Sequence, residues 1–401
     1  MLKWLRLIFI FLCVISIFYI ICLNTKLAQQ TVWKNGVNTE VQKQLHFIGQ
    51  QLEQHGAEKM QQYYPEGYFF SNVLYGLTWC DFLQKTQDKE MRKMGINEIN
   101  KATSALSSPK GKSVFPKQLS PQYGNFYAGW TNYLLAKKLA IQNSYADSLR
   151  YEQQCDSIVN AYEQNNQTFL ASYVGLSWPC DNIVAVASLA MHDKIYPAKY
   201  TSFLSEYIQK LKSNLDKDGL IPHKADYKTG LITEQAKGSS QSLMLIFLRE
   251  VDTNFANEQF AKYKIHFLDK RLGLYGVREH KIGISGKGDV DSGPVIWDIG
   301  GSASVVGAKT FALFNETSIA ETLRNSLEAF GMAIQNQNDK KYLFGQWLVA
   351  DCFIAWSNVS ESENEQHYDK SSKLTFGLYS IAVILLLLAL IKILLPCKQQ
   401  L

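Results

Sequence analysis

The sequence predicts an all-α protein, an (α/α)6 toroid of inner and outer helices flanked by an N-terminal and a C-terminal transmembrane helix. Three observations carry this prediction. Strand signals are scarce between residues 40 and 360, where apolar residues recur with the period of a helix. Within that region, a segment of small and apolar residues with few charges recurs six times. Each end of the chain holds a long apolar run without charge.

The two end segments are predicted to cross a membrane. Leu7–Leu23 holds seventeen residues without a charge and Leu374–Ile391 holds eighteen, and either can cross a bilayer core as a helix. Lys3 and Arg6 before the first run also suit a signal peptide, but no clear small-residue cleavage site follows. An uncleaved anchor is therefore favoured over a cleaved leader.

The net charge of the chain belongs to these ends. The 401 residues include 41 Lys+Arg and 36 Asp+Glu, a formal net charge of +5. Residues 1–30 and 371–401 each carry three basic residues and no acidic one, which leaves 35 basic against 36 acidic residues for 31–370. Because the body is nearly neutral, the charge gives no support for nucleic acid binding, and no nucleic acid partner is expected.

The basic residues also predict the topology. Lys3 and Arg6 precede the first run, and Lys392 and Lys398 follow the second. Since positive charge favours the cytoplasmic side, both termini are expected in the cytoplasm and the main domain outside it, in the periplasm or at the cell surface. Cysteines there either form disulfides or stay buried free thiols, and their spacing leaves both open: Cys80, Cys155, Cys180 and Cys352.

The body reads as an array of helix pairs. The six recurring segments begin at Phe70, Ala128, Cys180, Gly238, Gly301 and Phe344, at intervals of 58, 52, 58, 63 and 43 residues. Charged amphipathic segments such as Tyr200–Leu211 lie between them. A helix poor in charge is buried on all sides, and an amphipathic helix covers it from outside. Six such pairs favour a closed toroid over an open solenoid.

These patterns divide the chain into four parts. They are an N-terminal transmembrane anchor (1–30), an extracytoplasmic toroid (31–360), a polar tether (361–373), and a C-terminal transmembrane helix with a short basic tail (374–401).

Part of the body resembles a known family. The matching stretches lie between Phe126 and Asp269, with one acidic loop after them: Trp130–Leu139, Trp178–Leu189, Asp216–Gly219, Phe255–Phe267 and Asp289–Gly293. They resemble the bacterial linalool dehydratase/isomerase family, a helical toroid whose active site uses a His and two Cys. Cys180 falls where one Cys is expected, whereas the other position reads Ala171 and the His position falls near Gly129 and Trp130. The resemblance thus implies the fold more than the chemistry.

The strongest candidate for chemistry is the loop Lys281–Pro294. Its glycines make the backbone permissive, and it presents two carboxylates, Asp289 and Asp291. Two like charges in one cavity raise one pKa, which keeps a carboxylic acid protonated as a general acid. The alternative is a capped loop with solvated aspartates. A calcium loop fails because its twelfth position is Gly300, and no dinucleotide fingerprint is present, so no cofactor is expected.

Two further candidates lie where inner helices are predicted to begin. Cys180 and Asp181 can aim a thiol and a carboxylate into the central cavity, with helix capping by Asp181 or Asn182 as the alternative. Glu66 lies in an aromatic loop, where burial among rings would raise its pKa.

Aromatic and histidine residues complete the predicted site. Rings at these positions bind sugars or line apolar cavities, with plain core packing as the alternative. His residues in loops can serve as acid/base partners, and the absence of an HxH or HExxH motif makes a metal site unexpected. The expected substrate-binding residues are Tyr123, Trp130, Trp178, His223, His280, Trp297 and Trp347.

Three functions remain open. The first is an enzyme that uses a carboxylate acid/base pair to hydrolyse, or eliminate from, a glycan or another hydroxylated substrate. The second is a hydro-lyase similar to linalool dehydratase/isomerase that acts on an apolar alcohol taken from the bilayer. The third is an envelope protein without activity whose cavity binds a lipid or a protein partner. A small-molecule or oligosaccharide substrate is expected for the first two.

Overall fold

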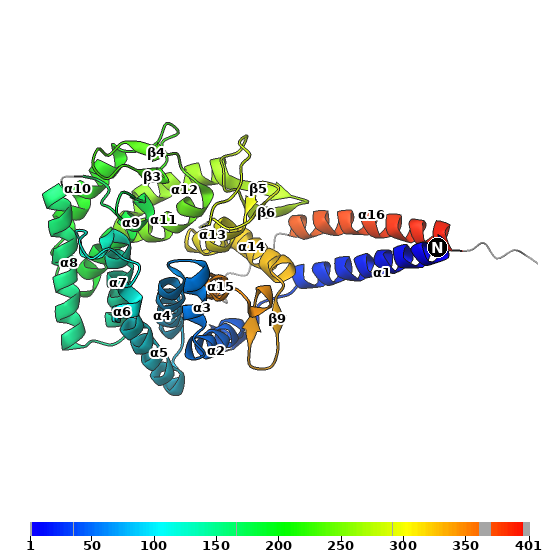
Figure 1. Ribbon diagram of the computed structural model, residues 1–401, viewed down its shortest axis with the longest axis horizontal. Coiled ribbons are helices and arrows are strands. Elements are labelled where there is room, and N and C mark those ends of the chain that lie inside the picture. Colours follow the sequence, from blue (N-terminus) through cyan, green and yellow to red (C-terminus); the bar gives the residue numbers. More distant parts are fainter. Residues whose placement is uncertain (1, 35, 166, 291, 361–369, 396–401) are drawn as a thin grey trace, which may run out of the picture.

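The computed structural model describes residues 2–34, 36–165, 167–290, 292–360 and 370–395. It is a ring of inner helices surrounded by outer helices, and two long helices project from one side of this body (Figure 1). Residues 361–369, most of the predicted tether, and the basic tail from residue 396 lie outside the described residues.

Six inner helices form the ring. They are α4 (Gly67–Lys85), α7 (Gly124–Leu139), α9 (Pro179–Ile195), α11 (Gly238–Val251), α13 (Gly301–Leu313) and α15 (Leu348–Asn358). Each packs against the next in this order, and α15 packs back against α4. The prediction of a closed toroid is therefore confirmed. Each of the six recurring segments lies on an inner helix or leads into one, because low charge throughout a segment indicates a helix buried on all sides.

The outer helices alternate with the inner ones along the chain. They are α2 (Thr39–Glu53), α5 (Lys89–Ser107), α8 (Tyr145–Asn165), α10 (Thr201–Lys212), α12 (Thr253–Phe267) and α14 (Thr317–Phe330). Shorter helices in the connections are α3 (Gly56–Tyr63), α6 (Pro109–Lys112) and the 3-10 turn η1 (Leu343–Gly345). The predicted amphipathic segment at residues 200–211 is α10, displaced by one residue.

Short antiparallel strand pairs lie in the connections between helices. They are β1 (Trp33–Lys34) with β2 (Val37–Asn38), β3 (Lys224–Ala225) with β4 (Ile232–Glu234), β5 (Leu268–Arg271) with β6 (Leu274–Val277), β7 (Val295–Ile296) with β8 (Ile299–Gly300), and β9 (Ile334–Gln335) with β10 (Lys340–Lys341). All of these pairs except β1–β2 lie in connections that lead into an inner helix.

Aromatic side chains fill the centre of the ring. Trp130 of α7 lies edge-on to Phe247 of α11, with ring centroids 5.2 Å apart, and Phe247 stacks on Trp356 of α15 at 6.0 Å. Phe70 of α4 reaches Trp130 from the other side at 5.6 Å. Large rings that bury this much surface stabilise the ring by filling its axis. Because side chains occupy the axis of the ring, we expect the substrate to bind elsewhere.

Helices α7 and α9 approach each other closely through Gly129. A Cβ atom at Gly129 would lie 2.8 Å from the backbone nitrogen and 2.9 Å from the Cα of Ala185. One turn later, Asn132 donates a hydrogen bond of 2.9 Å to Ser188 across the same interface. Because the opposing atoms are backbone, they cannot rotate away from an added methyl group.

We therefore expect Gly129→Ala to lower the free energy of unfolding by about 1–3 kcal/mol, although alanine is the better helix former. Chemical denaturation followed by circular dichroism measures the change. Gly301→Ala is the matched control, because a Cβ at Gly301 meets its nearest atom only at 3.4 Å. Equal stability of the two variants would contradict the tight α7–α9 contact.

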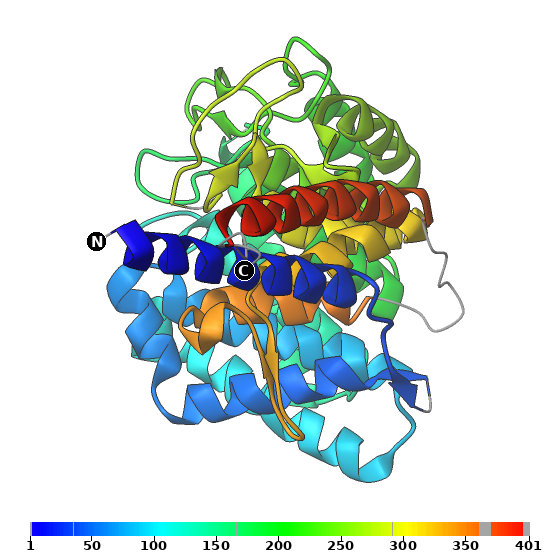
Figure 2. The same cartoon turned by 90° about the vertical axis from the view of Figure 1, so that its right-hand side faces the viewer.

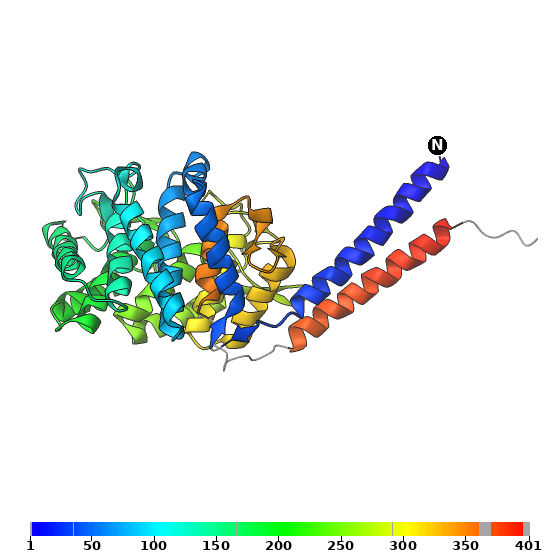
Figure 3. The ribbon, with the colours of Figure 1, turned by 90° about the horizontal axis from the view of Figure 1, so that it is seen from below.

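The projecting helices are α1 (Leu2–Leu27) and α16 (Lys370–Leu394). Each contains a stretch long and apolar enough to cross a membrane, with mean hydropathy 2.8 and 2.6. They pack on each other near the body, where Asn24 donates a hydrogen bond of 2.9 Å to Ser380 (Figures 2 and 3). Leu274 and Ala329 of the body pack against this base.

Candidate functional site

The candidate site lies at the end of the ring where the inner helices begin, here called the mouth. Most residues singled out in the sequence are found there or in the loops above it. They fall into two groups, one between α4 and α9 and one around the start of α11. Among the described residues, no group of three or more His, Cys, Asp or Glu side chains is arranged to hold a metal ion.

The first group joins a carboxylate to a tyrosine. Glu66 directly precedes α4 and accepts a hydrogen bond of 2.5 Å from the Tyr173 hydroxyl. The pKa of Tyr173 is raised far above its ordinary value by burial first, then by the charges of Glu66 and Asp181. Glu66 and Asp181, distant in sequence, are therefore both close enough to Tyr173 to act on its hydroxyl electrostatically.

The start of α9 holds the thiol and carboxylate of this group. Cys180 and Asp181 are both buried, and the Cys180 thiol lies 3.7 Å from an Asp181 carboxylate oxygen. Neither Asp181 nor Asn182 caps the helix, because α9 begins at Pro179 with Trp178 as its N-cap. Asn182 instead accepts a backbone hydrogen bond from Leu170, which ties the preceding loop to the helix. None of the described cysteines forms a disulfide.

Trp178 connects the two groups. Its ring lies edge-on to Tyr173 with centroids 5.9 Å apart, and the Lys224 ammonium lies 5.4 Å from its centroid. Lys224 in turn forms an ion pair of 2.6 Å with Glu234 of the second group. A half-buried aromatic face with a cation and carboxylates at its border is the kind of surface on which polar rings such as sugars bind.

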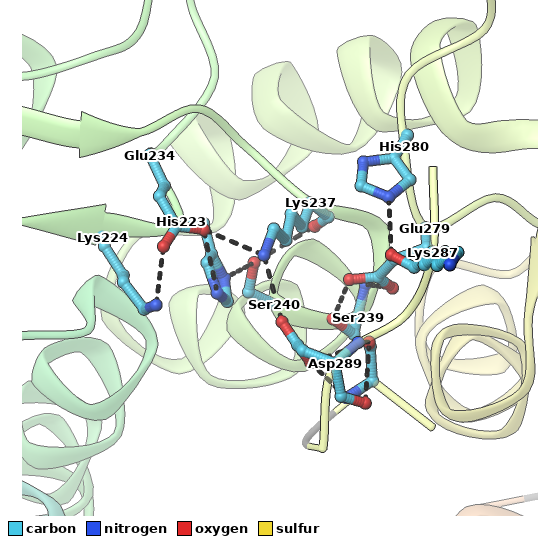
Figure 4. Close-up of polar contacts among 11 residues, drawn as sticks. His223, Lys224, Glu234, Lys237, Ser239, Ser240, Glu279, His280, Lys287 and Asp289 are labelled. Carbon is cyan, nitrogen blue, oxygen red and sulfur yellow. Dashed lines mark hydrogen bonds and ion pairs between the residues drawn. The ribbon is translucent and has the colours of Figure 1, made fainter. Parts of the chain in front are cut away.

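Lys237 is the centre of the second group. It directly precedes α11, and its ammonium contacts Glu234 at 2.9 Å and Asp289 at 3.1 Å (Figure 4). Burial disfavours both charges, but the lysines outweigh burial at Glu234 and lower its pKa to about 2. At Asp289, hydrogen bonds from Ser292 together with Lys237 likewise overcome burial and hold the pKa well below its usual range. Asp289 is therefore ionised at neutral pH.

Glu279 has the opposite electrostatic character. It follows β6, its side chain is 1% exposed, and it accepts hydrogen bonds from the Ser239 hydroxyl at 2.8 Å and the Ser239 backbone at 3.2 Å. Burial is the main cause that raises its pKa to about 7, and the charge of Asp289 adds to it. Glu279 thus holds a proton near neutrality, whereas Asp289 does not.

Sequence reasoning did not identify Glu279. The sequence predicted a role for the neighbouring His280 instead. Glu279 is set apart by its burial against the start of α11, which raises its pKa and which no local sequence pattern indicates. There Gly238 donates a backbone hydrogen bond of 2.9 Å to Glu279, and a Cβ at Gly238 would lie 1.8 Å from the Arg278 carbonyl oxygen. The sequence predicted an inner helix that begins near Gly238, but it did not indicate that residues 278 and 279 pack against this start.

The two histidines have different surroundings. His223 is buried, lies 3.1 Å from the Ser240 hydroxyl, and has its pKa lowered to about 4 by burial, so it is neutral at pH 7. His280 is half-buried and lies 3.1 Å from the Lys287 carbonyl oxygen, which fixes the loop. A Cβ at Gly286 would lie 2.4 Å from the His280 ring, so glycine lets the loop close over it.

The remaining predicted residues are dispersed. Tyr123 lies at the start of α7 with the Lys112 ammonium 5.5 Å from its ring centroid, and Trp130 is fully buried in the centre of the ring. Trp297 and Trp347 are exposed at the edge of the mouth, before α13 and α15. Asp291 lies outside the described residues.

The raised pKa of Glu279 predicts a pH-dependent stability. Since the folded protein binds this proton between the ordinary pKa of 4.5 and about 7, the free energy of unfolding falls as the pH rises through that window. The free energy of unfolding of Glu279→Gln relative to that of the wild type should therefore be higher at about pH 8 than at about pH 4, by on the order of 2 kcal/mol. Urea denaturation at both pH values measures this.

Asp289→Asn provides the opposite control. Because the pKa of Asp289 is lowered, its ionised form stabilises the fold above the ordinary aspartate pKa, and that contribution disappears as the pH falls. Removing the charge should therefore cost stability at neutral pH. A Glu279→Gln variant whose stability relative to wild type stays constant with pH would contradict the assignment of Glu279.

Comparison with known proteins assigns no family to the chain. No protein-family model matches the chain, and no curated protein matches its sequence. Its structure is similar to unsaturated glucuronyl hydrolase of Bacillus sp. GL1, responsible for degradation of glycosaminoglycan, at 8% identity and a TM-score of 0.48, covering 79% of this chain and 96% of that one. A heparin-specific unsaturated glucuronyl hydrolase gives 11% identity, a TM-score of 0.48, and coverage of 80% and 95%.

A third similar structure is the GH76 α-mannanase of Bacteroides thetaiotaomicron. It is 10% identical, with a TM-score of 0.44, and the match covers 73% of this chain and 85% of the mannanase. At such identities and TM-scores, the likeness assigns neither a family nor an activity to this chain. None of these three is a linalool dehydratase/isomerase, so that resemblance stays a prediction from the sequence.

Proposed function

We propose that the protein is a membrane-anchored, extracytoplasmic hydrolase that cleaves a bond in a glycan or a related hydroxylated substrate by acid/base catalysis. One observation carries the proposal. At the start of α11, Glu279 and Asp289 flank Ser239 and Lys237, and their surroundings shift the two pKa values in opposite directions. Carboxyl groups whose pKa values diverge in this way supply a proton donor and a proton acceptor at the same pH.

The roles follow from exposure. Asp289 is ionised and its side chain is 44% exposed, so it can accept a proton from an attacking water molecule. Glu279 is buried against Ser239, a half-buried residue at the start of α11 whose hydroxyl donates a hydrogen bond to the Glu279 carboxyl group. A proton from Glu279 would pass through the Ser239 hydroxyl to the leaving oxygen. The water oxygen then bonds to the sugar carbon as the carbon–oxygen bond to the leaving group breaks.

The first group of residues would bind the substrate. Trp178 offers a ring face bordered by Lys224, and Glu66, Tyr173 and Asp181 offer hydrogen-bonding groups beside it. Elimination needs the same pair of groups, with Asp289 taking a proton from carbon in place of water. The products distinguish the two, since elimination leaves an unsaturated ring.

The position in the cell completes the proposal. The two apolar helices α1 and α16 support anchoring, since each is long and apolar enough to cross a membrane. Basic residues near both chain ends support cytoplasmic termini, which would place the toroid outside the cytoplasm.

The test is turnover by the full-length protein in detergent or vesicles. It is incubated with a panel of polysaccharides and oligosaccharides, and new reducing ends and ultraviolet-absorbing unsaturated products are measured. Release of reducing ends that Asp289→Asn abolishes supports the proposal. Cleavage that persists in Asp289→Asn would refute the assigned roles, and binding without turnover by any substrate would favour a binding protein.

A second candidate is favoured by one observation. Cys180 is a buried thiol outside any disulfide at the start of α9, 3.7 Å from Asp181, at the position where the linalool dehydratase/isomerase family has an active-site Cys. This function predicts dehydration of an apolar alcohol that is lost in Cys180→Ala. The same variant should retain glycan cleavage if the first proposal holds.

A further inference from the structure

Exposed apolar side chains gather at one edge of the mouth. Six large side chains there are between 38% and 69% exposed: Tyr63, Phe330, Met332, Leu343, Phe344 and Trp347. We call this surface the rim patch. Isolated exposed apolar residues are ordinary, but a contiguous group indicates a contact with another apolar surface.

Contacts show that the rim patch is contiguous although its residues come from three segments. The rings of Tyr63, at the end of α3, and Trp347, before α15, have centroids 6.0 Å apart. The Leu343 backbone donates a hydrogen bond of 2.9 Å to Gly331, which follows α14 and Phe330. The end of α3, the end of α14 and the turn before α15 thus form one surface.

The rim patch begins at the base of the two apolar helices. The Phe330 ring lies edge-on to Phe376 of α16 with centroids 6.2 Å apart. Lys26 at the end of α1 donates a hydrogen bond of 3.0 Å to the carbonyl oxygen of Ala333, next to Met332. The surface is therefore continuous with the point at which both helices leave the body.

The backbone holds several of these side chains in place. Met332, Leu343 and Phe344 have φ values of 51°, 46° and 57°, in the left-handed region that bulky residues rarely adopt. Such conformations persist where the surrounding structure imposes them, and they cluster at sites with a function. Here they occur just before β9 and just after β10, and their apolar side chains are exposed.

The direction of the apolar helices brings the same edge toward a bilayer. In Figure 3, α1 and α16 lean away from the body toward the side on which α3 and the starts of the inner helices lie. Figure 2 shows both helices in front of the body, running across its middle. A bilayer crossed by α1 and α16 would therefore lie against the mouth on the side of α15.

We propose that the rim patch seats in the membrane interface, so that the mouth of the toroid opens at the bilayer surface. This inference rests on the anchoring by α1 and α16 proposed above but does not depend on the reaction catalysed. Tyr and Trp suit the position, since rings with one polar atom are enriched at the membrane interface. The site then acts on molecules held at the membrane surface.

The experiment is lipid photolabelling of the full-length protein in phosphatidylcholine vesicles that contain a diazirine-bearing phosphatidylcholine. Labelled peptides are identified by mass spectrometry. We expect label in α1 and α16 and, several-fold above background, in the peptides that carry Met332 and Leu343–Trp347. The matched control is the peptide with Tyr145, which is 86% exposed on α8 at the far side of the body, and it should stay at background.

The outcomes separate this inference from the anchoring. Label in α1 and α16 but no more at the rim patch than at Tyr145 would overturn the inference and leave the anchoring intact. No label in α1 or α16 would overturn both. A rim patch that is unlabelled but crosslinks to a second copy of the chain would make it a dimer contact instead. Replacing Met332 and Phe344 with serine should lower rim label several-fold while the label in α1 and α16 stays.

Discussion

Replacing Glu279 with glutamine is expected to lower the rate of glycan-bond cleavage at neutral pH roughly 100- to 10,000-fold, the usual contribution of a positioned proton donor. Glutamine keeps the size of the side chain and can still accept a hydrogen bond from Ser239, but it has no proton to give. Because the pKa of Glu279 is about 7, the wild-type rate should decline above that pH as the proton is lost. The pH profile of kcat measures both effects.

The proposed path of the proton adds a second, separable expectation. Ser239→Ala removes the hydroxyl that is hydrogen-bonded to Glu279 and should lower kcat by a similar factor, whereas Ser239→Thr keeps a hydroxyl and should retain most of the rate. Glu53→Gln, an exposed side chain on α2, is the control that should leave the rate unchanged. A Ser239→Ala variant with full activity would exclude the relay, and an unchanged rate in Glu279→Gln would exclude the proton donor.

The fold was predictable because burial on all sides leaves a signal in composition. Segments such as residues 180–189 carry almost no charge, and that alone marks an inner helix of a ring. The last recurring segment begins at Phe344 with an aromatic turn, and helix α15 follows this turn from Leu348. Closure of the ring depends on α15 meeting α4, a contact that spacing suggests and only the structure demonstrates.

The candidate site was predictable only in part, for a physical reason. Asp289 and Glu66 belong to loops whose glycines and rings are visible in the sequence. The proton-holding group is Glu279, and its pKa depends on burial against Ser239, which lies 40 residues earlier in the chain. For Trp130, the sequence predicted a substrate-binding ring because it lies near the start of an inner helix. The structure buries this ring completely in the core, and the sequence does not show which way the helix turns it.

The largest expected change in stability comes from a buried ionic cluster near the far end of the ring. Asp81 of α4 contacts Lys137 of α7 at 2.8 Å and Lys309 of α13 at 3.1 Å. Lys309 also donates a hydrogen bond of 3.0 Å to the Trp356 carbonyl oxygen of α15. Burial lowers the pKa of Lys309 to about 8 although the charge of Asp81 opposes this. One carboxylate therefore balances the buried Lys309 and the mostly buried Lys137, which come from opposite parts of the ring.

We expect Asp81→Asn to lower the free energy of unfolding by about 3–5 kcal/mol, because it leaves buried ammonium groups without a counter-charge. The deficit should shrink as the pH rises toward 8, since Lys309 without Asp81 gives up its proton at a lower pH. The measurement is denaturant unfolding across this pH range. Glu53→Gln, which removes the surface pair with Lys101, should cost no more than about 1 kcal/mol.

A triple variant determines whether charge is the cause. Replacing Asp81 with leucine and both Lys137 and Lys309 with methionine removes every charge of the cluster at similar volume, and should restore most of the stability that Asp81→Asn loses. If the triple variant is as unstable as Asp81→Asn, packing around α4 matters more than the ion pairs. If Asp81→Asn itself is no less stable than Glu53→Gln, the cluster is not desolvated enough to hold α4, α7 and α13 together, and closure of the ring depends on its aromatic centre alone.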